Sequence, residues 1–396
     1  MMSTSMSLKK FLTLVVLGLI TWIAFSYSRP VPAVGPQTNF SQPKTSSAVD
    51  LPWPTYGQGA IGVVGQGVLA TYGERKPVPI ASITKVVTAL AVLKEKPLKV
   101  GEKGPNITIT DEDVAIYDEF YSQGGSVTPI TKGSQISEYD GLQSMLIPSS
   151  NNMAATVAKW AFGSVDNYVK YANQMLSDLG FKQTKVDEAS GFSASSASTA
   201  SELIKLGELA LANEVVADIV KKSSANLPVA GEVRNINTLV GEDGVIGIKT
   251  GNTEAAGGCL LFASKRTIDG KDITVIGVVL GAPTRATAIA DSKTLLQSVD
   301  KAFQAVTVVK KDQVVGHYES PWGAKADAVA KEDLTMLVWR GTKLKTDVKL
   351  SQIDTPASTS FDIGSVSVTA GQKTANVSVV LKGELLGPSW TWRIFR

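Results

Sequence analysis

The sequence contains a single cysteine and a single histidine among its 396 residues. Because a disulfide needs two cysteines, Cys259 excludes an internal disulfide and also a zinc site built from cysteines. His317 likewise excludes a metal site made of several histidines, and it lies outside the motifs described below. A Ser-His-Asp triad is therefore not expected, and a nucleophilic serine in this chain needs a different base. We expect Cys259 to be a small core residue and His317 to be a surface or packing residue.

A strong excess of charge of one sign is also lacking. The chain has 39 Lys and Arg residues against 36 Asp and Glu residues, so its formal net charge is only +3. No stripe of basic residues interleaved with aromatic residues runs along the sequence, which argues against nucleic acid as a partner. Hydrophobic residues make up 43% of the chain and charged residues 19%, as is typical of a globular protein with a large core.

One uncharged apolar run occurs near the N-terminus, over residues 11–27, and Lys9 and Lys10 precede it. We interpret residues 1–28 as a signal or membrane-anchor segment with its positive charge on the cytoplasmic side. Aromatic residues in the run suit a membrane interface and favour an anchor, whereas the small residues of Ser26-Tyr27-Ser28 would suit a cleavage site. In both cases the rest of the protein is expected outside the cytoplasmic membrane.

The remaining chain is expected to contain a linker and two domains. Residues 29–50 are rich in Pro, Ser, Thr and Gln without periodicity, so we expect a flexible linker. In residues 51–305, segments of strand character at both ends enclose amphipathic helices, which predicts an α+β domain with one sheet flanked by helices. Residues 306–396 alternate apolar with polar residues and predict a separate all-β domain. Alternation in residues 390–396 favours a final strand over a membrane-surface element.

The segment from Ala81 to Leu90 is expected to begin a helix that carries a nucleophile. Its apolar residues have the spacing of one helical face, and Ser82 is expected to cap the N-terminus of the helix. Lys85 follows three residues later, which places its amine beside the hydroxyl of Ser82. Lysine can activate a serine only when it is neutral, and burial or a second cation lowers its pKa. Alone, this S-x-x-K pattern is weak, because an amphipathic helix with a solvated lysine has the same residues.

Two further patterns supply a proton relay and substrate-binding groups, which the S-x-x-K pattern lacks. Ser149-Ser150-Asn151 follows a predicted helix break, where a serine can relay a proton and an asparagine amide can hold a substrate peptide group. The register of Ser150-Asn151-Asn152 fits the same pattern. Lys249-Thr250-Gly251 ends a predicted strand, with a cation and a hydroxyl for a carboxylate and a glycine that lets substrate approach the strand edge. Lys249 is also a candidate for the second cation that lowers the pKa of Lys85.

The three motifs in this order resemble those of the serine-type D-alanyl-D-alanine carboxypeptidases, a family of low-molecular-mass penicillin-binding proteins. The similar segments span most of residues 51–303 and read ASITKVVTAL, LIPSSNNMAATVAKWAFGS, DEASGFSASSASTASEL and GIKTGNTEAAGGCLLFASKR. The resemblance implies a penicillin-binding/β-lactamase-like transpeptidase domain, whereas the β-rich C-terminal domain matches the family only weakly. Gly163-Ser164 lies at the family's distance from Ser149, which favours that register. Asn152-Met153 departs from the usual Asp-Ala.

The resemblance implies a role for each matched residue. Ser82 would be the acylated nucleophile, Lys85 its base and Ser149 a proton relay. The oxyanion hole would use the backbone N–H groups of Ser82 and Asn252, and no metal or cofactor is implied. The residues implied to bind the substrate are Asn151, Lys249, Thr250, Gly251 and Asn252.

The implied reaction removes the terminal D-alanine from peptidoglycan stem pentapeptides through an acyl-enzyme. β-Lactams would be inhibitors, and the N-terminal segment would hold the enzyme at the extracytoplasmic face of the bacterial cell membrane, or release it if cleaved. A β-lactamase is disfavoured because Phe192 stands where class A enzymes have an asparagine after the residue equivalent to Glu188. A non-catalytic penicillin-binding scaffold is disfavoured because no motif residue is lost. Endopeptidase and transpeptidase activities use the same residues and stay open.

Overall fold

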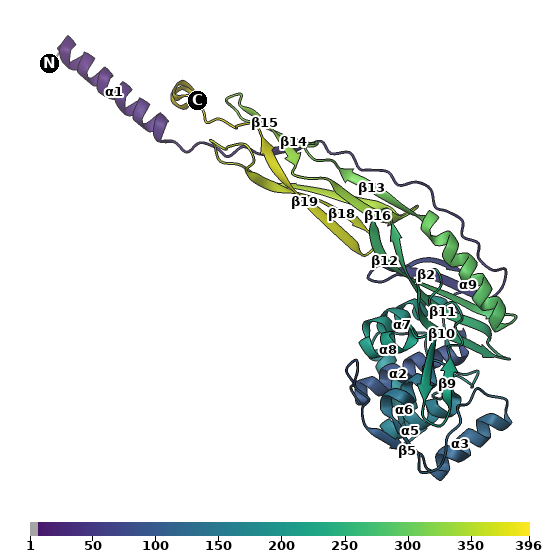
Figure 1. Ribbon diagram of the computed structural model, residues 1–396. Helices are drawn as coiled ribbons and strands as arrows, with labels where there is room; N and C mark the ends of the chain where they lie inside the picture. Colours follow the sequence, from purple (N-terminus) through teal and green to yellow (C-terminus); the bar gives the residue numbers. More distant parts are fainter. Residues whose placement is uncertain (1–6) are drawn as a thin grey trace. The chain divides into compact units, whose positions relative to one another are not determined.

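The computed structural model describes residues 7–396, so residues 1–6 of the expected N-terminal segment lie outside the described residues. The chain forms two compact units (Figure 1). One unit contains residues 48–304 and carries all three motifs. The other combines the chain before residue 48 with residues 305–396.

The first unit is built on an antiparallel sheet with the strand order β10-β11-β12-β2-β3. Strands from the beginning of the unit thus pair with strands from its end, and helices α7 and α9 cover the sheet (Figure 1). The predicted α+β fold with one sheet flanked by helices is confirmed. Because β10 is an edge strand, one of its sides is free of a strand partner. The strands are β2 (Gln58–Val63), β3 (Gly67–Tyr72), β10 (Val245–Thr253), β11 (Gly257–Ile268) and β12 (Lys271–Ala282).

The helices of this unit follow local sequence signals. The helix at Asp111–Ser122, which the sequence analysis did not predict, begins with a capping box in which Thr110 and Asp113 bond each other's backbone N–H groups. A hairpin joins β8 (Ser224–Leu227) to β9 (Gly231–Arg234). Two further two-stranded sheets pair segments that lie far apart in the chain, β4 (Val78–Pro79) with β7 (Ala197–Ser198) and β5 (Asn106–Thr108) with β6 (Gln135–Ser137). The helices are α2 (Thr84–Glu95), α3 (Asp111–Ser122), α4 (Glu138–Leu146), α5 (Asn151–Phe162), α6 (Val165–Asp178), α7 (Ala200–Ala212), α8 (Glu214–Val220) and α9 (Arg285–Val299), with a 3-10 turn, η1 (Ala81–Ile83), before α2 and another, η2 (Asp300–Ala302), after α9.

The second unit contains a six-stranded sheet with the order β1-β14-β15-β19-β18-β17 and a separate β13–β16 pair. The inward residues of the alternating pattern, such as Val366, Val368 and Val379, are fully buried in a core of their own. The predicted all-β region is confirmed. Its strands are β1 (Pro36–Thr38), β13 (Phe303–Val309), β14 (Val314–Glu319), β15 (Lys325–Ala330), β16 (Leu334–Trp339), β17 (Leu344–Leu350), β18 (Asp362–Ala370) and β19 (Lys373–Lys382).

Two expectations for the ends of this unit are wrong. Within the expected flexible linker, β1 pairs with β14 and Val34 packs beside Ile353, because the edge of β14 offers unpaired backbone groups. The final segment is a short helix, α10 (Trp390–Phe395), and not a strand. Trp390 and Ile394 are also four residues apart, so the same residues fit a helix, and Ser389 caps it by accepting a hydrogen bond from the backbone of Trp392.

Helix α1 (Leu8–Ser28) covers the apolar run of the N-terminal segment. It has 21 residues, and its most apolar stretch of 18 residues has a mean hydropathy of 1.9 and is only 6% buried. At 1.5 Å per residue it is about 30 Å long, which matches the hydrocarbon core of a bilayer. A signal sequence near an N-terminus has the same length and composition.

Candidate active site

Ser82 and Lys85 lie on η1 and the first turn of α2, in the core of the first unit. Lys85 Nζ lies 2.7 Å from Ser82 Oγ, so the hydroxyl and the amine meet as the three-residue spacing predicts. The expected capping role of Ser82 is wrong, because residues 81–83 form a 3-10 turn and α2 begins at Thr84 without a side-chain cap. The carbonyls of this turn are instead satisfied by the backbone N–H of Thr84.

Lys85 has no exposed surface and three hydrogen-bonding partners. Besides Ser82 Oγ, its Nζ lies 2.7 Å from Asn151 Oδ1 and 2.7 Å from the carbonyl oxygen of Ser190. Burial lowers the pKa of Lys85 to about 7, although the charge of Glu188 opposes this shift. A neutral amine has two N–H groups and one lone pair. When the N–H groups donate to Asn151 and Ser190, the lone pair is left for the hydroxyl proton of Ser82.

The two asparagines of the second motif have different surroundings. Asn151, the first residue of α5, meets Lys85, whereas Asn152 holds the backbone of Thr128. Asn152 Oδ1 accepts from the N–H of Thr128 at 3.0 Å, and its Nδ2 donates to the carbonyl of Thr128 at 3.1 Å. Ser150 caps α5, and Ser149 is buried just before it with a positive φ of 65°. This geometry explains why an asparagine at position 152 is compatible with the site.

The third motif lies on the edge strand β10, next to the turn that carries Ser82. Lys249 and Thr250 are buried, and burial together with the charges of Lys85 and Arg285 holds the pKa of Lys249 well below its usual range. A Cβ on Gly251 would lie 2.8 Å from the carbonyl oxygen of Ile80, so the glycine lets β10 approach η1. The sequence analysis attributed this glycine to the approach of substrate, whereas the close neighbour is the chain's own turn.

A cavity of about 540 Å³ opens over Ser82. Arg285, at the start of α9, lies at its edge, and the sequence analysis did not single out this residue. Thr284 caps α9 and gave a signal for the helix start, but nothing local linked residue 285 to motifs more than 30 positions away. The lining residues are Ser82, Gln123, Gly124, Gly125, Ser126, Asn151, Phe192, Asn252, Thr253, Glu254, Ala255 and Arg285.

The loop at residues 187–193 supplies the carbonyl of Ser190 that accepts a hydrogen bond from Lys85. Glu188 accepts a 2.6 Å hydrogen bond from the N–H of Ser190, the residue whose carbonyl meets Lys85. Gly191 has a φ of 78°, and a Cβ there would lie 1.9 Å from the carbonyl oxygen of Ala81. The loop therefore packs directly on the turn of the nucleophile. The sequence analysis considered Glu188 only as a possible lactamase residue and missed this positioning role.

The lone cysteine and the lone histidine stand apart from this chemistry. Cys259 is buried on β11 opposite Gly251, and burial raises the pKa of its thiol to about 11. The complete burial of Cys259 confirms the expectation of a core residue, and a thiol with a raised pKa is a poor nucleophile. His317 lies on β14 in the other unit, where its Nδ1 is 2.8 Å from an oxygen of Asp327.

The sequence family described as D-alanyl-D-alanine carboxypeptidase matches residues 63–284 of the chain. The chain belongs to this family. A D-alanyl-D-alanine endopeptidase of Escherichia coli (strain K12) is 32% identical over 230 residues, which are 55% of this chain and 68% of that protein. The D-alanyl-D-alanine carboxypeptidase DacF of Bacillus subtilis (strain 168) is 24% identical over 323 residues, which are 78% of this chain and 77% of the relative.

Solved structures of penicillin-binding proteins share the fold. Penicillin-binding protein 6B from Escherichia coli aligns with a TM-score of 0.63 at 19% identity, over 86% of this chain and 99% of that one. Penicillin-binding protein 5 from Haemophilus influenzae aligns with a TM-score of 0.59 at 19% identity, over 88% of this chain and 100% of that one. The family match and the relatives confirm the resemblance to the low-molecular-mass penicillin-binding proteins. The chain is a serine-type D-Ala-D-Ala peptidase, and the β-lactamase and scaffold alternatives are not favoured.

Proposed function

We propose that this D-Ala-D-Ala carboxypeptidase forms its acyl-enzyme on Ser82, with Lys85 as the base. The observation that supports this most strongly is the environment of Lys85 Nζ, which is fully buried and lies 2.7 Å from Ser82 Oγ. The pKa of about 7 leaves much of Lys85 neutral at neutral pH. A base is most effective when its pKa lies near the working pH, so this value suits proton abstraction from a serine.

Acylation then proceeds in two balanced steps. Ser82 Oγ attacks the carbonyl carbon of the penultimate D-alanine while its proton passes to Lys85, and the backbone N–H groups of Ser82 and Asn252 hold the oxyanion. The C–N bond then breaks, and the leaving amine takes the proton back from Lys85 by way of Ser149. The terminal D-alanine departs and leaves an ester on Ser82.

The carboxylate of the leaving D-alanine is the anchor of the substrate in this proposal. Lys249, Thr250 and Arg285 would bind it, at the place where burial and the charges of Lys85 and Arg285 lower the pKa of Lys249. An arriving carboxylate supplies the missing negative charge and raises the pKa of Lys249 again. The free side of β10 can pair with the backbone of the stem peptide, and Asn151 can hold its amide.

Deacylation restores the enzyme. Water gives a proton to Lys85 and its oxygen attacks the ester, so that Ser82 regains its hydroxyl and the shortened peptide leaves. A β-lactam acylates the same serine, but its amine stays tethered to the acyl group and hinders hydrolysis. The helix α1 would hold the enzyme at the outer face of the cytoplasmic membrane, close to peptidoglycan.

The proposal is tested by the release of D-alanine from a stem pentapeptide. Wild-type protein should release one equivalent of free D-alanine per peptide, and Ser82→Ala should release none. Ser150→Ala removes a neighbouring hydroxyl that caps α5 and serves as the matched control, which should retain activity. Equal D-alanine release by wild type and Ser82→Ala would refute the assignment of the nucleophile.

A further inference from the structure

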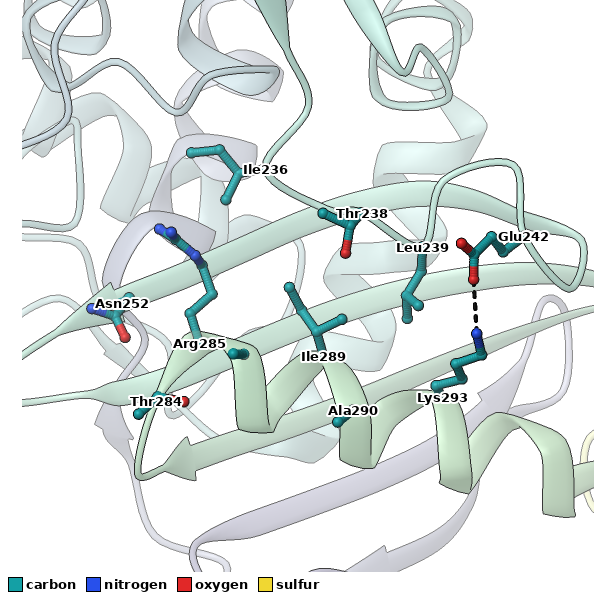
Figure 2. A pocket seen from close by; sticks show the side chains of 11 residues that line it. Ile236, Thr238, Leu239, Glu242, Asn252, Thr284, Arg285, Ile289, Ala290 and Lys293 are labelled. Carbon is teal, nitrogen blue, oxygen red and sulfur yellow. Dashed lines mark hydrogen bonds and ion pairs between the residues drawn. The ribbon is translucent and has the colours of Figure 1, made fainter.

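Of the described residues that line the cavity over Ser82, only Arg285 and Glu254 carry a formal charge. Arg285 begins α9, and Figure 2 shows it beside Asn252 near the end of β10. Glu254 follows Thr253, the last residue of β10, in the turn that leads to β11. Arg285 binds the substrate carboxylate in the proposed function, whereas Glu254 has no role in the mechanism above.

The carboxylate of Glu254 is exposed and forms no ion pair with any described residue of the chain. The turn that carries it is held by a hydrogen bond of 3.2 Å, in which the hydroxyl of Thr253 accepts from the backbone N–H of Ala256. The position of Glu254 beside the cavity is thus set by the fold. Its negative charge is available to a cation of the substrate.

The distance along β10 determines which substrate residue can meet Glu254. Thr250, at the expected substrate carboxylate, and Glu254 are four positions apart, which is about 13 Å in an extended chain. A stem peptide that pairs antiparallel with the free side of β10 runs from the carboxylate toward Glu254. The residue two positions before the terminal D-alanine then lies about 7 Å along this path. A side chain of four carbons and an amine spans about 6 Å more, so its end reaches Glu254.

The chemistry of the cavity matches such a side chain. A carboxylate attracts a protonated amine and accepts hydrogen bonds from it. Phe192 lines the same cavity and is 36% exposed, so its ring offers apolar surface to the methylene groups. An acylated amine carries no charge, and a substrate with this neutral side chain would leave Glu254 without a cationic partner.

We propose that Glu254 is a specificity-determining residue, and that it recognises the side-chain ammonium group of a diamino acid two positions before the terminal D-alanine. This subsite lies on the acyl side of the scissile bond and does not contact the residue that leaves. The inference rests on the proposed function, because that function places the substrate carboxylate at Thr250 and the peptide along β10. It adds a preference for stem peptides whose side-chain amine is free over those whose amine is acylated.

The test compares two peptides that end in L-lysyl-D-Ala-D-Ala and have a blocked α-amine. One keeps the side-chain amine free, and in the other this amine is acetylated. Wild type should show a kcat/KM for D-alanine release that is about five-fold higher for the free amine, the upper range for an exposed ion pair. Glu254→Gln keeps the size of the side chain and removes its charge, so the ratio of the two kcat/KM values should fall to about one. Glu254→Lys places a like charge there and should invert the preference.

Two controls separate the subsite from the catalytic machinery. Glu232→Gln removes the same charge from an exposed position on β9 outside the cavity, and it should keep the wild-type ratio. Stoichiometric labelling of Glu254→Gln by penicillin shows that Ser82 still reacts. Equal kcat/KM values for both peptides in wild type, or a wild-type ratio in Glu254→Gln, would overturn the subsite, while D-alanine release leaves the proposed function standing. Loss of D-alanine release and of labelling in wild type would overturn both.

Discussion

The pH dependence of acylation follows directly from the burial of Lys85. The pKa of this lysine is lowered to about 7, and only the neutral amine can take the proton of Ser82. A group with this pKa is about one-tenth neutral at pH 6 and about nine-tenths neutral at pH 8. The acylation rate constant at saturating penicillin should therefore rise about ten-fold between pH 6 and pH 8, with a midpoint near 7.

Stopped-flow measurement with a fluorescent penicillin checks this prediction. Saturating penicillin is needed because the charge of Lys249 affects penicillin binding. Under saturation the first-order rate constant reports acylation and not binding. Glu188→Gln keeps a hydrogen-bond acceptor for Ser190 but removes the charge that raises the pKa of Lys85, so its midpoint should move to lower pH. Glu319→Gln, an exposed change on β14, should leave the midpoint in place. A rate constant that is flat from pH 6 to pH 8, or that rises only above pH 10, would refute Lys85 as the base.

Further predictions concern the supports of the site. Asn151→Ala should slow acylation at least ten-fold with little loss of stability, whereas Asn152→Ala should lower the free energy of unfolding by about 1–3 kcal/mol, because the carbonyl of Thr128 loses its partner and its N–H keeps only Ser150 Oγ. Urea unfolding and penicillin labelling distinguish these two outcomes. Gly191→Ala should slow acylation and lower the melting temperature, because its Cβ would meet the carbonyl of Ala81. Lys85 binds fewer protons in the folded state than in the unfolded state between about pH 7 and 10.5, so its contribution to stability improves with pH across that window. Relative to Lys85→Met, wild type should gain about 3 kcal/mol from pH 7 to pH 9.5 in urea unfolding, and an equal pH dependence of both proteins would contradict the lowered pKa.

The part of the site that the sequence predicted is the part encoded locally. Ser82 and Lys85 meet because three residues make one helical turn, and this geometry can be read without knowledge of the fold. The sequence predicted that strands from both ends of the domain form one sheet. It did not predict that β10 is the edge strand, because strand order is not encoded in any one segment. Lys249 was assigned to the site from the order of the three motifs and not from the periodicity of apolar residues.

The contacts that the sequence did not predict join distant segments. Ser190 meets Lys85 across 105 positions, and nothing in the loop itself marks its carbonyl as a partner for an amine. Arg285 was missed for the same reason, because the packing of α9 on the sheet brings it to the active site. The strand at Pro36–Thr38 was missed because its stability comes from the edge of β14 and not from its own composition.

The last residues of the chain show that periodicity does not always distinguish a strand from a helix. Residues 390–396 satisfy both a two-residue and a four-residue spacing, and seven residues are too few for the pattern to decide between a strand and a helix. The hydrogen bond between Ser389 and Trp392 belongs to a helix start, and Ser389 was the signal available in the sequence.

The central claim is that the hydroxyl of Ser82 becomes the ester of the acyl-enzyme. Mass spectrometry of the intact protein after reaction with benzylpenicillin, followed by peptide mapping, tests it most directly. Wild type should gain the mass of one penicillin on the peptide that contains Ser82, and Ser82→Ala should gain none. An adduct on Ser149 or Ser150, or stoichiometric modification of Ser82→Ala, would contradict the account.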